Sequence, residues 1–186
     1  MSRVTVVRKD GRKSYIYRDG ARILGSTMAK EGIRLVYGGG GSGIMGAVAH
    51  AVRAGGGDIT GIIPEFLIPK ERGNMGSDGL SDELGDVIVT KNMHERKTKL
   101  FERSDAFVAL PGGIGTLEEL VEMLTWAQLG RHEHPVVLAN LSGFWDPLIM
   151  LLDHMITQKF MTSNIRRFYG VVDQVDDILP RIEAAL

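Results

Sequence analysis

Two glycine-rich segments constrain this chain of 186 residues more than any other feature of its sequence. The first, GGGGSGIMG at 38–46, directly follows the aliphatic run 34–37, and the second, PGGIG at 111–115, directly follows the run 106–110. A longer segment of helical period comes after each of them. Glycine-rich turns between a buried strand and a helix are typical of parallel α/β folds, which bind ligands at the carboxyl ends of their strands.

The same alternation of short aliphatic runs and longer helical segments continues along the whole chain. We expect strands at 4–7, 34–37, 59–63, 87–89, 106–110 and 136–139, and helices at 17–31, 43–53, 93–104, 116–130, 143–157 and 176–186. Because the strands hold consecutive aliphatic residues, both of their faces should be buried. The sequence therefore predicts an α/β fold, a Rossmann-like doubly wound parallel sheet with helices on both faces, in a single domain over residues 1–186. The long polar stretch 70–85 is expected to form a lid or a substrate-side loop.

Charge and composition exclude several kinds of partner and cofactor. With 22 basic and 23 acidic residues the net charge is −1, so we expect neither nucleic acid nor an anionic membrane as a partner. No apolar run approaches the roughly 18 residues of a membrane span, and charges interrupt the first apolar residues, so we expect a cytoplasmic protein. The absence of cysteine excludes thiol catalysis, iron–sulfur clusters and cysteine-based zinc sites. His132 and His134 are close enough to suggest a metal, but their loop position predicts a solvated surface instead.

Both glycine-rich segments are suited to an anion. Glycine lets backbone N–H groups approach a ligand closely, and a helix start adds unpaired donors and the positive end of its dipole. Residues 41–46 also match the G-x-G-x-x-G pattern of dinucleotide sites, with Glu65 about twenty residues later, and a tight turn alone is a further explanation. Two such loops at one sheet edge favour a nucleoside monophosphate held from several sides.

Charged residues gather beside the second loop. Glu118, Glu119 and Glu122 lie in the first turns of the helix after it, and Arg96 and Lys97 begin the preceding helix, so both groups belong to the same sheet edge. For the carboxylates the alternatives are catalysis and a capping box, in which Glu119 would bond the amide of an N-cap at residue 116. For the cations the alternative is an ordinary solvated helix face.

The two glycine loops and the charged residues beside them resemble those of the LOG (Lonely Guy) family of cytokinin riboside 5′-monophosphate phosphoribohydrolases. Members of this family are often labelled lysine decarboxylase-like in error. The resemblance covers the chain from about Tyr17 to the C-terminus. It depends on LVYGGGGSGIMGAVAHAV (35–52), GIIPEFL (61–67), the segment 92–130 and HPVVLAN (134–140). The PGGxGTxxE pattern at 111–119, with MHERK about twenty residues upstream, is highly specific.

The resemblance implies hydrolysis of the N-glycosidic bond of N6-substituted adenosine 5′-monophosphates, and of AMP as a second candidate, to free base and ribose 5-phosphate. It implies that Glu119 stabilises the oxocarbenium-like sugar and activates water, and that Arg96 orients the substrate and favours the leaving group. The residues expected to bind the substrate and its phosphate are Gly39, Gly40, Gly41, Gly43, Met93, Lys97, Gly112, Gly113, Gly115, Thr116 and Glu122. No metal or organic cofactor is expected, and nothing marks the Schiff-base lysine that pyridoxal phosphate needs. A homodimer is expected from kinship.

The chain departs from the family after its first strand, where a Cys-Gly-Ser loop is usual and Val7, Arg8 and Lys9 stand here. Either the reading frame is altered at this point, or Arg8 and Lys9 bind the phosphate directly. Met123, Trp126 and Leu129 are expected to be core residues or, alternatively, to line a prenyl pocket or a dimer face. Two other functions stay open, namely a noncatalytic nucleotide sensor and an NAD(P) oxidoreductase.

Overall fold

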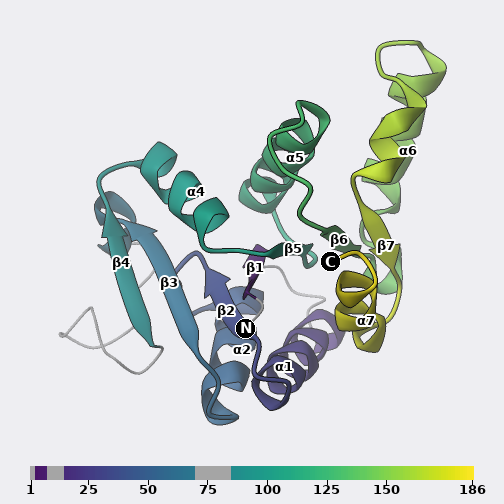
Figure 1. Cartoon of the computed structure of the whole chain (residues 1–186). Helices are drawn as coiled ribbons and strands as arrows, with labels where there is room; N and C mark the ends of the chain where they lie inside the picture. Colours follow the sequence, from purple (N-terminus) through teal and green to yellow (C-terminus); the bar gives the residue numbers. More distant parts are fainter. Residues whose placement is uncertain (1–2, 8–14, 70–84) are drawn as a thin grey trace.

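The computed structural model describes residues 3–7, 15–69 and 85–186. These residues form a seven-stranded sheet in the order β4-β3-β2-β1-β5-β6-β7, and every neighbouring pair of strands is parallel (Figure 1). The strands are β1 Arg3–Val7, β2 Arg34–Tyr37, β3 Ile59–Pro64, β4 Asp86–Thr90, β5 Ala106–Ala109, β6 Val136–Ala139 and β7 Gly170–Val172. The chain builds the sheet outward from β1 to β4 and then returns to β5 on the other side of β1. The strand order therefore reverses between β1 and β5, and ligands bind such sheets at the carboxyl side of this point.

Helices cover both faces of the sheet, with α1, α2 and α7 on one side and α4, α5 and α6 on the other (Figure 1). The α-helices are α1 Tyr15–Lys30, α2 Gly43–Ala54, α4 Met93–Glu102, α5 Ile114–Gln128, α6 Asp146–Thr157 and α7 Ile178–Glu183. Short 3-10 helices are η1 Glu65–Leu67, η3 Leu141–Gly143, η4 Ser163–Arg167 and η5 Val175–Asp177. No helix in the described ranges is long and apolar enough to cross a membrane.

The strands are buried on both faces because their side chains alternate between two apolar layers. In β5, Phe107 and Ala109 pack in the layer of α5 and α6, while Val108 packs in the layer of α1 and α2. In β6, Val136 and Leu138 face the first of these layers and Val137 faces the second. This alternation explains the consecutive aliphatic residues in the sequence and confirms the predicted Rossmann-like α/β fold.

Several predicted boundaries are wrong, each for a local reason. Helix α5 begins at Ile114 rather than 116, because Gly113 is its N-cap. Helix α6 begins at Asp146 rather than 143, because η3 precedes it and Ser142 there has a φ of 54°. The predicted helix 176–186 is split between η5 and the shorter α7.

The strand β7 was absent from the prediction. It has three residues, Gly-Val-Val, at the sheet edge, and Val171 between its two neighbours is partly exposed, so it lacks the aliphatic run of the central strands. The expected lid at 70–85 lies, apart from its last residue, outside the described residues, and the same is true of Arg8 and Lys9.

Candidate active site

The first part of the candidate site is the start of α4, just after β4. Asn92 caps this helix, because its Oδ1 accepts a hydrogen bond of 2.9 Å from the Glu95 backbone N–H. The carboxylate of Glu95 in turn accepts a hydrogen bond of 2.9 Å from the Lys91 backbone N–H. This firm helix start places residues 93, 96 and 97 on one side of α4, three and four positions apart, so their side chains share a face. Glu95 also pairs with Lys99 at 3.7 Å on the more exposed side of the helix.

Arg96 reaches across from α4 to α5 and pairs with Glu119. The distance from its Nη1 to Glu119 Oε1 is 3.0 Å, and both side chains are largely buried, at 13% and 14% exposed. The Arg96 Nε donates a hydrogen bond of 3.1 Å to the carbonyl oxygen of Ile62 in β3. The guanidinium is therefore held by two elements besides its own helix.

Glu119 does not cap its helix. Since α5 begins at Ile114 with Gly113 as N-cap and no side-chain cap, Glu119 lies in the second turn, where its carboxylate faces Arg96. The capping-box alternative is therefore wrong.

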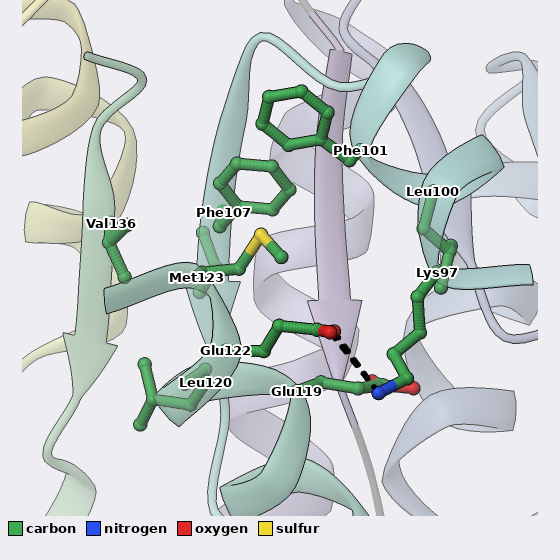
Figure 2. A pocket seen from close by; sticks show the side chains of 11 residues that line it. Lys97, Leu100, Phe101, Phe107, Glu119, Leu120, Glu122, Met123 and Val136 are labelled. Carbon is green, nitrogen blue, oxygen red and sulfur yellow. Dashed lines mark hydrogen bonds and ion pairs between the residues drawn. The ribbon is translucent and has the colours of Figure 1, made fainter. Parts of the chain in front are cut away.

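Lys97 lies between the other two carboxylates of α5. Its Nζ donates hydrogen bonds to Glu118 and Glu122. The distance from Nζ to the nearer Glu122 oxygen is 3.2 Å, and Figure 2 shows this contact with Glu122. Burial lowers the pKa of Lys97, but the hydrogen bonds and charges of the two glutamates raise it above its ordinary value. Lys97 thus compensates part of the negative charge that surrounds Glu119.

Glu119 borders an apolar cavity of about 30 Å³ between α4, α5 and β5. In Figure 2, Glu119, Glu122 and Lys97 lie at one end of this cavity and the rings of Phe101 and Phe107 at the other. Burial raises the pKa of Glu119 above its ordinary value, Glu118 and Glu122 add to this rise, and Arg96 and Lys97 oppose it. A carboxylate whose pKa is raised is a stronger base than an ordinary one, which suits a group that accepts a proton from water.

The two glycine loops meet the same edge of the sheet. In the first loop Gly39 and Gly43 have φ values of 79° and 64°, so the turn itself requires glycine at both positions. Gly40 is buried, whereas Gly41, just before the N-cap of α2, and Gly43, the first residue of α2, are half-buried.

The second loop leads into α5. Gly112 and Gly113 are half-buried, and a Cβ atom on Gly115 would meet nothing within 4 Å. Thr116 is fully buried, and its Oγ1 has no hydrogen-bond partner within the described part of the chain. An unpaired buried hydroxyl at a helix start is an unused donor for an anion.

Comparison with known proteins decides the family. The family described as "Possible lysine decarboxylase" matches residues 45–182. The cytokinin riboside 5′-monophosphate phosphoribohydrolase LOG of Oryza sativa subsp. japonica is 42% identical over 183 residues, which are 95% of this chain and 72% of that protein. The chain belongs to the LOG family. LOG4 of Arabidopsis thaliana, which carries the same enzyme name, is 40% identical over 93% of this chain and 77% of its own length.

Solved structures support the fold of this LOG protein. The molybdenum cofactor binding protein of Rippkaea orientalis superposes with a TM-score of 0.68 at 21% identity, over 98% of this chain and 96% of that one. The Moco carrier protein of Chlamydomonas reinhardtii gives 0.68 at 22% identity, over 100% and 99%. At these identities the likeness shows a shared Rossmann-like fold and no more.

The histidines of the LOG protein differ from the prediction of a solvated surface. His132 is buried, its Nε2 is 2.9 Å from the carbonyl oxygen of Met123, and its Nδ1 accepts a hydrogen bond from the His134 backbone N–H. His134 is half-buried, with its Nδ1 3.1 Å from the carbonyl oxygen of Asp105. The prediction is wrong because this loop folds back over the rings of Phe101 and Phe107. No metal-binding group of three or more His, Asp or Glu side chains occurs in the ranges that the structure covers.

Met123, Trp126 and Leu129, which were expected to lie in the core, a prenyl pocket or a dimer face, differ in their burial. Met123 is buried and lines the cavity beside Glu119. Trp126, on the same helix α5, is half-buried and packs against the apolar core, and the Arg131 guanidinium lies 5.2 Å from its ring centre. Leu129 is 69% exposed and lies away from the cavity.

Sequence reasoning missed two contributors to the site. The Ile62 carbonyl bonds Arg96 through the backbone, which no side-chain pattern reveals. Gly38, at the first position of the glycine run, lies against the Arg96 guanidinium. The sequence feature that could have indicated a role for Gly38 is its position directly after the predicted strand 34–37.

Proposed function

We propose that this LOG protein hydrolyses the N-glycosidic bond of N6-substituted adenosine 5′-monophosphates, releasing the free base and ribose 5-phosphate. The observation that carries the proposal is the buried ion pair between Arg96 and Glu119, 3.0 Å apart, beside two glycine loops at one sheet edge. The enzyme names of the rice and Arabidopsis relatives support it.

In this proposal the second glycine loop binds the 5′-phosphate. Backbone N–H groups of Gly112, Gly113 and Gly115 and the unpaired Thr116 hydroxyl supply donors at the start of α5, where the helix dipole favours an anion. The first loop, with Gly39, Gly40, Gly41 and Gly43, lines the nucleotide. Met93, Lys97 and Glu122 complete the expected set of binding residues.

Glu119 supplies the chemistry at the sugar. As the bond between C1′ and N9 breaks, its electron pair goes to the base and positive charge develops on the sugar ring, which an adjacent carboxylate stabilises. Water adds to C1′ and gives a proton to Glu119. The departing base nitrogen takes up a proton from solvent, and Glu119 returns its own proton to solvent, so that one water molecule is consumed overall. The reaction as written needs neither a metal nor an organic cofactor.

Arg96 supports the reaction in two ways. Its fixed guanidinium favours the ionised form of Glu119 against burial, which is the form that stabilises the sugar and accepts a proton. Its planar donor groups can also orient the substrate.

The first experiment separates an enzyme from a noncatalytic nucleotide sensor. Isopentenyladenosine monophosphate and AMP are each incubated with the protein, free base is measured by chromatography, and AMP binding is measured by calorimetry. The proposal predicts release of base from at least the N6-substituted substrate. Binding with no release would favour the sensor, and binding of NAD(P) alone would favour the oxidoreductase.

We further propose that the protein is a homodimer in the cytoplasm and binds neither nucleic acid nor membranes. Large apolar side chains are exposed on α5 and α6, among them Val121 and Met150, as at many interfaces. Sedimentation velocity tests the dimer, and a single monomeric boundary at micromolar concentration would contradict it. Fractionation of cells tests the location.

A further inference from the structure

Gly38 lies directly after β2 and touches the Arg96 guanidinium. A Cβ atom placed on Gly38 would lie closer than 3.0 Å to Arg96 Nη2, a separation that real Cβ atoms essentially never show. The same atom would be 3.2 Å from Met45 Sδ on the other side. Even an alanine at this position therefore needs space that the guanidinium occupies.

Backbone conformation does not explain why residue 38 is a glycine. Gly39 and Gly43 in the same loop have positive φ values, whereas Gly38 does not. Any residue could adopt the backbone of Gly38, so the close approach of Arg96 is what requires the missing side chain.

The guanidinium cannot move aside without losing a partner. Its Nε donates to the Ile62 carbonyl oxygen at 3.1 Å, its Nη1 pairs with Glu119 at 3.0 Å, and the same Nη1 is 3.9 Å from Met93 Sδ. Because the guanidinium is rigid and planar, a shift of Nη2 away from β2 changes the geometry of the other bonds at once.

We propose that Gly38 is a positioning residue for the Arg96–Glu119 pair, a role separate from nucleotide binding by the loop that follows it. The catalytic part of this inference depends on the proposed function. A side chain at 38 displaces the guanidinium, and Glu119 then loses the neighbouring charge 3.0 Å away that opposes the effect of burial on it.

The kinetic test compares the wild type with Gly38→Ala. With isopentenyladenosine monophosphate as substrate, we expect kcat to fall about 10- to 100-fold, since misplacement by about 1 Å has effects of this size, with KM changed less than twofold. The acid limb of the pH–rate profile should move to higher pH, because Glu119 loses a charge that lowers its pKa. An unchanged acid limb, or a kcat within twofold of the wild type, would overturn the proposal.

A second test does not depend on activity and covers the case in which Gly38→Ala folds poorly. Arg96→Ala removes the atom closest to the new Cβ and leaves only the 3.2 Å approach to Met45 Sδ, so Gly38→Ala should lower the urea midpoint much less in the Arg96→Ala background than in the wild type. Equal losses in both backgrounds, or a double variant that does not fold, would show that Gly38 serves the loop rather than Arg96. Absence of base release by the wild type would refute the proposed function and leave this coupling to decide the role of Gly38.

Discussion

Arg96 on α4 and Glu119 on α5 form a buried ion pair 3.0 Å long, 23 positions apart in sequence and joined at the carboxyl edge of the sheet. Burial raises the pKa of Glu119 while Arg96 opposes the rise, so the ionisation of this carboxyl group depends on its partner.

Replacing Arg96 by methionine should lower kcat by roughly 10²- to 10³-fold, comparable to the loss of one charge-stabilising donor in other enzymes. Without the guanidinium the pKa of Glu119 rises further, so the acid limb of the pH–rate profile should move upward. Steady-state rates of base release between pH 4.5 and 8.5 check this. An acid limb at the wild-type position would mean that Arg96 does not control Glu119.

Lys97→Met should also shift that limb upward, since Lys97 lowers the pKa of Glu119. It should destabilise the fold by about 1–3 kcal/mol, because Glu122 is left in a partly buried place without its cation. Lys99→Met is the matched control on the same helix. Its ion pair with Glu95 is longer and more exposed, so its effect on urea unfolding should stay within about 0.5 kcal/mol. Equal effects of the two substitutions would contradict the interpretation.

Thr116→Val should separate binding from stability. The substitution removes a buried hydroxyl that has no partner in the described structure, so the free energy of unfolding should stay the same or rise by up to about 1 kcal/mol. If that hydroxyl binds the 5′-phosphate, affinity for ribose 5-phosphate should fall about tenfold, the value of roughly one hydrogen bond. Thr125→Val, on the exposed side of α5, is the control. Unchanged affinity measured by calorimetry would remove Thr116 from the phosphate site.

Stability should decrease in mild acid because of His132. Burial lowers the pKa of this imidazole, so the unfolded chain binds a proton more readily than the folded one. The contribution of the neutral His132 side chain to the free energy of unfolding is therefore fully present above the unfolded pKa of about 6.5. It is lost as the pH falls from there through the lower pKa of the folded state. Urea unfolding between pH 4.5 and 7.5 should show a shallower pH dependence for His132→Asn than for the wild type. His50→Asn, at an exposed position on α2, should keep the wild-type slope.

Much of the fold could be predicted from local pattern. Buried strands with consecutive aliphatic residues and the glycine turns after β2 and β5 were sufficient for the parallel sheet and its ligand-binding edge. The pattern did not predict features that depend on neighbouring elements, such as the edge strand β7, and it placed the start of α5 at 116 although Gly113 is the N-cap.

The sequence predicted which edge of the sheet carries the candidate site, but not which of its side chains contact each other. Periodicity placed Arg96 and Glu119 at one edge, yet only tertiary packing pairs them and brings the Ile62 carbonyl to the guanidinium. Likewise, nothing local to His132 indicates that aromatic rings from α4 and β5 cover it.

Glu119→Gln tests the central claim most directly, with Glu133→Gln, exposed in the loop before β6, as the matched control. The amide keeps the size of the side chain but cannot carry the charge or accept the proton from water. With isopentenyladenosine monophosphate at saturation, we expect base release by Glu119→Gln to fall at least 10³-fold while Glu133→Gln stays near the wild-type rate and both variants still bind AMP. Release by Glu119→Gln at the wild-type rate would contradict the account.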